Sequence, residues 1–183
     1  MAVLKIVTDP DPVLREVARP VGAVTAEISG LANDMVDTMR AAEGLGLAAP
    51  QVGRSLRMFV LDANGAGIVF IDPDIIRAEG CAAHEEGCLS IPGVTRLVTR
   101  AERVIVEASG ISGAKFQMEC KGIFAAAVQH EIDHLDGVLM TDAHMHADPC
   151  LTPEQEAELE RRREGPFISH EEMGRRIGHK DDH

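Results

Sequence analysis

Two stretches of the chain carry hydrophobic residues at the three- and four-residue steps of an α-helix. The first predicts an amphipathic helix over residues 26–42, ended by Gly44, with an apolar face of Ile28, Leu31, Met35, Met39 and Ala42. The second predicts a helix over residues 122–136, ended by Gly137, with an apolar stripe of Val128, Ile132 and Leu135. We therefore expect one long helix near each end of the main body of the chain.

The segments between these helices are typical of β-strands. Strand-like runs occupy residues 57–62, 67–73, 103–108 and 115–120, and a turn-rich stretch joins the last two. The glycine-rich segment 44–53 contains Pro50, which disfavours a regular element there. Because the helices lie at both ends and do not alternate with the strands, the pattern favours a single compact α+β domain.

The last forty residues differ from the rest in composition. We assign residues 1–142 to the main domain and residues 143–183 to a C-terminal extension. Within the extension, Thr152 and Pro153 are typical of a helix start, and Gly165 is typical of a stop. The pattern predicts a short helix over about residues 152–164, followed by a mobile end.

Composition and charge exclude several classes of function. The formal charge of −12 argues against DNA or other nucleic acid as a partner, because phosphate binding needs clustered Lys and Arg. No stretch has the length of a membrane span or of a signal-peptide core, which indicates a cytoplasmic protein without a membrane partner. In that reducing compartment, the four cysteines are expected to be thiols or metal ligands.

Residues 129–137, with the sequence QHEIDHLDG, have the spacing of a metal site. His130 and His134 are four residues apart, so their rings lie on one face of the predicted helix. Glu131 lies beside that face, where its carboxylate can reach a metal-bound water without being a ligand. Two imidazoles do not complete such a site, so the third ligand decides the chemistry.

The metzincin solution to the third ligand is not available, because Met140 stands where that pattern would have its third histidine. Two other solutions remain open. A glutamate from the extension (Glu154, Glu156 or Glu158) would make the protein a zinc metalloendopeptidase. Cys88, in the turn-like segment 85–93, would instead give a thiolate and two imidazoles, which leave a fourth position open for water, as in catalytic sites.

Three segments together closely resemble the signature motifs of the peptide deformylase family, in the same order. They are GLGLAAPQ (44–51), EGCLS (86–90) and QHEIDHLDG (129–137). The resemblance extends from the start of the chain to about Met140. It implies a peptide-deformylase-like fold, with antiparallel or mixed sheets around a central helix that carries HEIDH. It also implies the activity, which is hydrolysis of the formyl group from formyl-methionyl peptides in bacterial protein biosynthesis, with release of formate.

The resemblance also implies roles for individual residues. Cys88, His130 and His134 would bind one divalent metal per chain, Fe²⁺ in the cell with Zn²⁺, Ni²⁺ or Co²⁺ as substitutes. Glu131 would be the acid–base residue, and the Gln51 amide and the Leu89 N–H would form the oxyanion hole. The substrate would contact the Gly46 backbone and a pocket expected to include Leu45, His84, Glu86, Ile123, Ala126 and Ala127. The formylated ends of nascent peptides would be the partners.

The chain departs from the family pattern in three places. Thr95 stands where an arginine usually supports the cysteine segment and Glu86, and Arg96 beside it would point to the opposite face of an extended segment. His84, Ala126 and Ala127 replace aliphatic residues of the methionine pocket, which predicts a wider or more polar pocket. The extension lacks the basic helix that some members use at the ribosome, so ribosome binding is not supported. A relative that kept the metal site only as a binding module is the non-enzymatic alternative.

Overall fold

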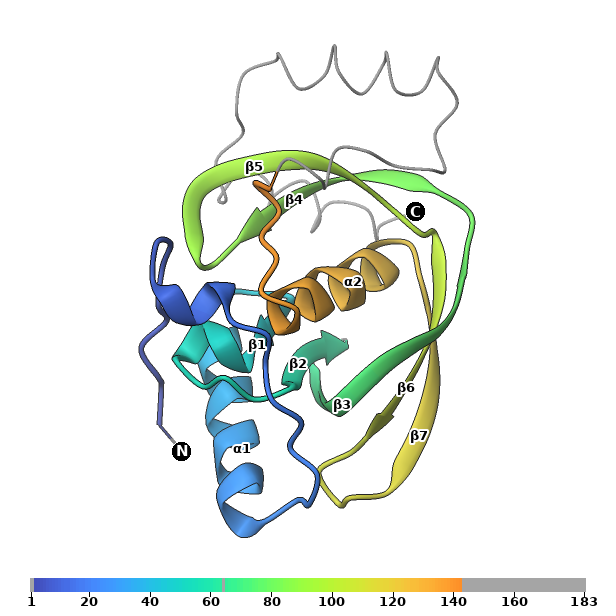
Figure 1. Ribbon diagram of the computed structural model, residues 1–183. Coiled ribbons are helices and arrows are strands. Elements are labelled where there is room, and N and C mark those ends of the chain that lie inside the picture. Colours follow the sequence, from blue (N-terminus) through green and yellow to red (C-terminus); the bar gives the residue numbers. More distant parts are fainter. Residues whose placement is uncertain (1, 64, 143–183) are drawn as a thin grey trace.

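The two predicted helices are present in the computed structural model, which describes residues 2–63 and 65–142 (Figure 1). Helix α1 spans Ala26–Ala41, and the hydroxyl of Thr25 caps it by accepting a hydrogen bond from the Ile28 N–H. Helix α2 spans Ile123–Leu135. It is followed by Gly137, whose φ of 73° is in the left-handed region that favours glycine. Both predictions were correct to within one residue at each end.

The strands form two antiparallel sheets. The larger sheet has the order β1-β2-β3-β6-β7, and β4 and β5 form a separate two-stranded sheet. The bounds are Gly46–Ala48 for β1, Met58–Ala63 for β2, Ala66–Glu79 for β3, Ala82–Cys88 for β4, Ile91–Arg100 for β5, Arg103–Ser109 for β6 and Lys115–Lys121 for β7. The four predicted strands correspond to β2, the first half of β3, β6 and β7. The expected α+β class is therefore confirmed.

The structure contains elements that the hydrophobic pattern did not predict. The segment 44–53 is not irregular throughout, because it holds the short strand β1 and a 3₁₀-helix, Ala49–Val52. A second 3₁₀-helix spans Pro12–Arg15. Cys88 was predicted in a turn-like segment. It is the last residue of β4, opposite Ile91, and only Leu89 and Ser90 lie between the two strands.

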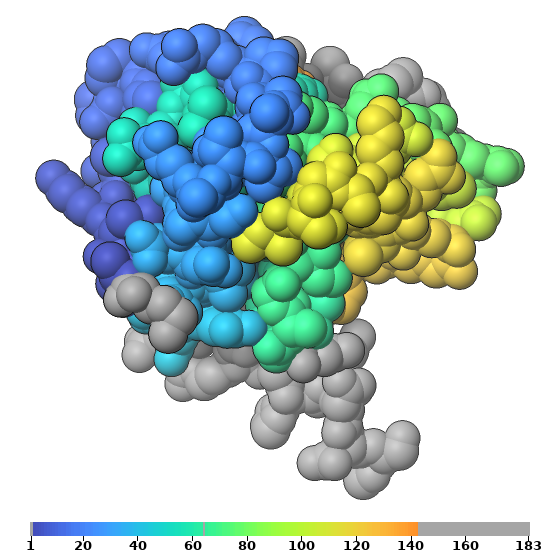
Figure 2. All heavy atoms as spheres, turned by 90° about the horizontal axis from the view of Figure 1, so that it is seen from below, coloured from blue at the N-terminus to red at the C-terminus, as the bar shows by residue number. Residues whose placement is uncertain are grey.

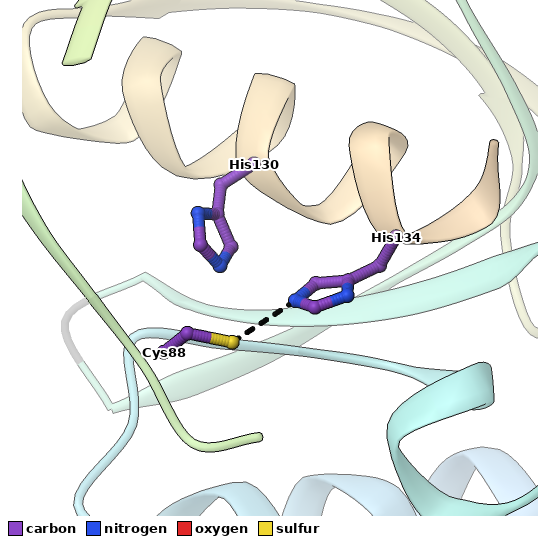
Figure 3. A group of neighbouring side chains, drawn as sticks. All are labelled: Cys88, His130 and His134. Atoms are coloured by element: carbon purple, nitrogen blue, oxygen red, sulfur yellow. Dashed lines mark hydrogen bonds between the residues drawn. The ribbon is translucent and has the colours of Figure 1, made fainter. Parts of the chain in front are cut away.

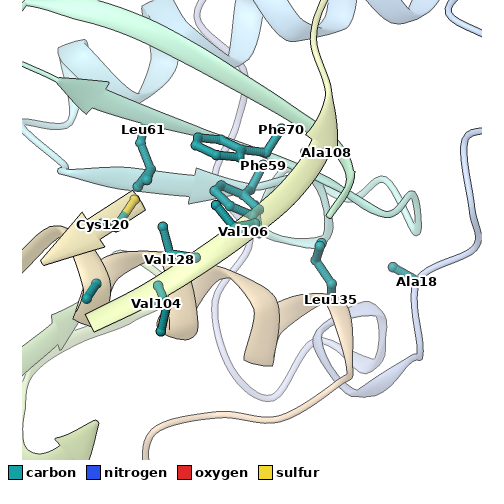
Figure 4. Packing of buried hydrophobic residues seen from close by; sticks show 12 residues of the cluster. Ala18, Phe59, Leu61, Phe70, Val104, Val106, Ala108, Cys120, Val128 and Leu135 are labelled. Carbon is teal, nitrogen blue, oxygen red and sulfur yellow. The ribbon is translucent and has the colours of Figure 1, made fainter. Parts of the chain in front are cut away.

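Strand β2 is buried on both faces because each face is covered by a helix. Phe59 and Leu61 belong to a cluster with Val128 and Leu135 of α2. The rings of Phe59 and Phe70 stack there with centroids 4.5 Å apart (Figure 4). On the other face, a second cluster includes Met58 and Val60 of β2 together with Ala32, Met35, Val36 and Met39 of α1. Helix α2 is thus held between the two sheets (Figure 1).

The face seen from below is formed by the N-terminal third of the chain, in blue and cyan, by part of β3, in green, and by the hairpin of β6 and β7, in yellow (Figure 2). None of the helices within 2–63 and 65–142 is long and apolar enough to cross a membrane.

The helix predicted at about 152–164 and the mobile end predicted after it lie outside the described residues. The division into a domain of residues 1–142 and an extension of residues 143–183 stays a prediction.

Candidate active site

Three potential metal ligands from two separate elements meet at one point. Cys88 ends β4, and His130 and His134 are one turn apart on α2 (Figure 3). Their ligand atoms all lie within 4.8 Å of one another, and the Cys88 Sγ is 3.2 Å from the His134 Nε2. Two donors bound to one tetrahedral ion, at about 2.1 and 2.3 Å, are separated by about 3.6 Å. The spacing of this group therefore fits a single divalent ion.

A carboxylate fixes the orientation of the His130 ring, and burial sets the protonation of His134. The His130 Nδ1 is 2.9 Å from a carboxylate oxygen of Glu86, which can only accept a hydrogen bond, so Nδ1 carries the proton. In the neutral form of the His130 ring, Nε2 is then the nitrogen that can bind a metal. Burial holds the pKa of His134 well below its ordinary value, so its ring is in the neutral form that binds metals. A carboxylate behind a ligating histidine is a common feature of metal sites.

Glu86 is itself held by a buried arginine. Arg100 Nε and Nη2 donate to the two oxygens of Glu86 at 2.8 and 3.0 Å, and Arg100 Nη1 donates to Asp133 at 2.5 Å. Burial would raise the pKa of Glu86, but the hydrogen bonds from Arg100 and His130 lower it to about 2. Glu86 is therefore a carboxylate at neutral pH, and it connects the hairpin to the His130 side of α2.

Arg100 supports Glu86, although Thr95 stands where the family usually has the supporting arginine. Thr95 lies opposite Gly87 on β5 and is buried, while Arg100 at the end of the same strand contacts both Glu86 and Asp133. Sequence reasoning missed Arg100 and Asp133, because a lone arginine at a strand end reads as a surface residue.

The Arg100→Leu substitution should destabilise the fold strongly. It would leave Glu86 buried without its cation and would deprive Asp133 of the same partner. Breaking a buried ion pair from one side costs about 3–5 kcal/mol. Urea unfolding of the wild type, Arg100→Leu and a surface control, Arg77→Leu, measures this loss, because the Arg77 side chain is 61% exposed. Equal losses of unfolding free energy in the two variants would show that Arg100 contributes no more to stability than a surface arginine.

Glu131 lies directly beside the three ligands. The residue is 4% exposed, and its Oε2 has no hydrogen-bond partner among the described residues. Burial is the main reason that its pKa is raised to about 7. Gly46 on β1 makes room for it, because a Cβ at that position would clash with the Glu131 Oε1. A carboxyl group with this pKa can take up and release a proton near neutral pH.

Two hydrogen-bond donors from other segments lie close to Cys88. The Gln51 Oε1 accepts from the Ala48 N–H at 2.7 Å, which directs the Gln51 Nε2 towards the Cys88 Sγ, 3.5 Å away. Gln51 is 2% exposed, so its amide is fixed in the interior. The Leu89 N–H, in the turn after Cys88, makes no hydrogen bond within 2–63 and 65–142. It is therefore a free donor next to the ligand group.

A cavity of about 370 Å³ opens onto this group. Of the residues expected to contact substrate, Leu45, Gly46, Glu86, Ile123, Ala126 and Ala127 line it, together with Gln51, Cys88, Leu89, His130 and Glu131. His84 does not line the cavity; it lies on β4 opposite Val98, four residues before Cys88. Carboxylates that the sequence analysis did not single out, Glu43, Asp62 and Glu85, also line it. The wall of the cavity therefore combines apolar side chains, such as Leu45 and Ile123, with several carboxylates.

The other positions considered for the third ligand do not supply one among the described residues. Met140 is buried and packs against Cys88 and Val98, which makes it part of the wall behind the thiol. Glu154, Glu156 and Glu158 lie in the undescribed extension. Within the part of the chain that the structure describes, Cys88, His130 and His134 form the one group of three or more possible metal ligands.

Comparisons with known proteins agree with this arrangement. A sequence model of the family Polypeptide deformylase matches residues 3–149. A peptide deformylase from Alkalilimnicola ehrlichii is 49% identical over 146 residues, which cover 78% of this chain and 82% of that protein. A second, from Acetivibrio thermocellus, is 46% identical over 164 residues, which cover 90% and 93% of the two chains.

Solved structures of peptide deformylases share the fold. One from Legionella pneumophila has a TM-score of 0.76 at 38% identity, over 98% of this chain and 99% of that one. One from Synechococcus elongatus, in complex with actinonin, has a TM-score of 0.73 at 35% identity, over 89% and 87% of the two chains. These relatives do not support the two alternatives, a metalloendopeptidase and a binding module. The chain belongs to the polypeptide deformylase family.

Proposed function

We propose that Cys88, His130 and His134 hold one divalent metal ion, beside which this chain hydrolyses the N-terminal formyl group of formyl-methionyl peptides. Deformylation is the activity of the family to which the chain belongs. The observation that carries the proposal is the convergence of three buried ligand atoms within 4.8 Å of one another. They lie at the wall of a cavity that also exposes the Glu131 carboxyl group.

Glu131 is proposed to move the proton. A divalent metal bound to this group would lower the pKa of a water molecule and polarise the formyl oxygen. Glu131 accepts a proton from the attacking water as the water oxygen bonds to the formyl carbon. It then gives that proton to the departing nitrogen as the carbon–nitrogen bond breaks, so the products are formate and a free amino terminus. The raised pKa of about 7 suits a group that performs both transfers.

Gln51 and Leu89 are proposed to stabilise the charge that develops during the attack. Negative charge accumulates on the formyl oxygen as the carbon becomes tetrahedral. The Gln51 Nε2 and the Leu89 N–H are fixed donors on the cysteine side of the cavity, as described above. Donors that are already oriented need no reorganisation in the transition state. Gly46 is proposed to bind the substrate through its backbone, because it lines the cavity and β1 is the edge strand of its sheet.

The sulfur and nitrogen donors suit both Zn²⁺ and Fe²⁺. We propose Fe²⁺ as the native ion, with Ni²⁺, Co²⁺ or Zn²⁺ as substitutes, and the bacterial cytoplasm as the location. Nascent formylated peptides are the proposed partners, and nothing in the extension supports ribosome binding. A thiolate ligand and Fe²⁺ would together make the site sensitive to oxygen and peroxide, so the protein should be handled anaerobically.

The activity and the pocket can be tested in one experiment. Protein purified anaerobically with Fe²⁺ should release formate from formyl-Met-Ala-Ser, and the absence of detectable release from metal-loaded protein would overturn the proposed function. Ala126 and Ala127 line the cavity where bulkier aliphatic residues are usual, and a missing methylene contact is worth about 1–3 kcal/mol. We therefore expect formyl-Phe-Ala-Ser to be a comparatively good substrate. A preference for the methionine peptide well above a hundredfold in kcat/KM would contradict the wider pocket.

A further inference from the structure

The N-terminal segment touches all three sequence motifs of the site. The Val7 N–H donates to the Gln51 carbonyl at 2.9 Å, and the Asp9 N–H donates to the Ser90 carbonyl at 2.9 Å. Further along, the Ala18 N–H donates to the Leu135 carbonyl at 2.8 Å, at the end of α2. Figure 1 shows this blue segment passing the 3₁₀-helix that follows β1, the β4–β5 turn and the end of α2.

The first two of these bonds hold the backbone of the two proposed oxyanion donors. Gln51 is in the 3₁₀-helix after β1, whereas Leu89 precedes Ser90 in the β4–β5 turn, which belongs to a different sheet. Among the backbone hydrogen bonds outside regular elements, neither segment donates to or accepts from the other. The hydrogen bond from Gln51 Nε2 to the Cys88 Sγ, at 3.5 Å, joins the two side chains and leaves the two backbones without a direct bond. The N–H groups of Val7 and Asp9 supply a backbone link between the two segments.

The segment is itself anchored on the α1 side of the molecule. Leu4 and Ile6 pack against the cluster that contains Leu47 and Ala49, and Leu89 packs against the same cluster. The Leu4 N–H also donates to the Thr38 hydroxyl of α1 at 2.8 Å. Because these anchors lie immediately before Val7, the segment has a fixed course where it meets Gln51 and Ser90.

We propose that residues 7–9 are a positioning element that sets the distance between the Gln51 and Leu89 donors. The proposal rests on the proposed function, since it requires both groups to act on the formyl oxygen. Val7 and Asp9 are not proposed to contact the three metal ligands or the substrate. They act through the carbonyls of Gln51 and Ser90, so their removal should change the transition state more than substrate binding.

The Val7→Pro variant tests the element, because proline has no N–H to give to the Gln51 carbonyl. Lys5→Pro is the matched control, since Lys5 lies in the same extended stretch and its N–H makes no hydrogen bond within the described residues. Loss of a whole oxyanion donor costs roughly 10²–10³ in kcat, so misplacement of one should cost about tenfold. We expect Val7→Pro to lower kcat about tenfold, with KM and metal content unchanged, and Lys5→Pro to retain the wild-type kcat.

A double-mutant cycle with Gln51→Ala separates positioning from general loosening. If Val7 acts through Gln51, Val7→Pro should lower kcat little further in the Gln51→Ala background. The same tenfold loss in both backgrounds, or equal losses in Val7→Pro and Lys5→Pro, would overturn the positioning role. A Gln51→Ala protein with wild-type kcat would instead refute the oxyanion role in the proposed function. Should Val7→Pro not fold, Ile6→Ala loosens the same segment and is tested in the same cycle, with the same expected lack of additivity.

Discussion

Glu131→Gln should abolish nearly all formate release while the protein keeps its metal. The amide has the shape of the carboxyl group but cannot accept the proton of the attacking water. General acid–base groups contribute roughly 10²–10⁴ in rate, so we expect kcat to fall by at least a hundredfold. Because Glu131 is not among the three ligands, metal content should stay at the wild-type level. Stopped assays of formate and metal analysis of the same samples measure both quantities.

A control for this experiment is Glu107→Gln, the same substitution on β6. Glu107 contacts Gln117 and Lys115 on the neighbouring strand and does not line the cavity. Its rate should equal that of the wild type. A Glu131→Gln protein that keeps its metal and turns over at a near wild-type rate would show that another group carries the proton.

Cys88→Ala should lose metal and activity together. The thiolate is the third ligand of the proposed site, and without it two imidazoles on α2 remain. We expect metal content to fall from about one ion per chain to a small fraction of that, with formate release falling in parallel. Anaerobic purification with Fe²⁺ or Ni²⁺, followed by metal analysis and the formate assay, measures the two losses.

Two controls test whether the loss is specific to this thiol. Cys120→Ala removes another buried cysteine, which belongs to the core cluster under α2 and should leave metal content unchanged. Glu154→Ala removes the first glutamate that an endopeptidase site could have used, and it should change neither metal content nor rate. If Cys88→Ala retained both its metal and its rate, the third ligand would lie elsewhere.

The helices and the pairing of the two histidines could be predicted because their signals are local. The i, i+4 spacing of His130 and His134 places both rings on one face of α2, whereas Cys88 was assigned to the same site through the resemblance to the family. The apolar periodicity of residues 26–42 and 122–136 likewise depends only on neighbours within two turns. Nothing from the rest of the fold is needed to read these features from the sequence.

The β4–β5 hairpin could not be predicted in the same way. Its buried positions include Glu86, Thr95, Thr99 and Arg100, which read as exposed in a hydrophobic pattern. Glu86 and Arg100 can be buried because charges from β4, β5 and α2 compensate one another, and that compensation exists only after the three elements have met. The pairing of Glu86 with Arg100 is therefore visible only in the folded structure.

The separation of the site residues along the chain has a consequence for folding kinetics. Contacts in the site join positions 37, 44 and 46 residues apart, and the ion pair between Arg15 and Asp142 closes a span of 127 residues. Chains dominated by such distant pairings fold more slowly than chains with local contacts, because the entropy of closing long loops must be overcome first. The proposed site residues thus assemble only when α2, close to the end of the described chain, has docked. During synthesis, a growing chain would have no deformylase activity of its own until that helix had left the ribosome.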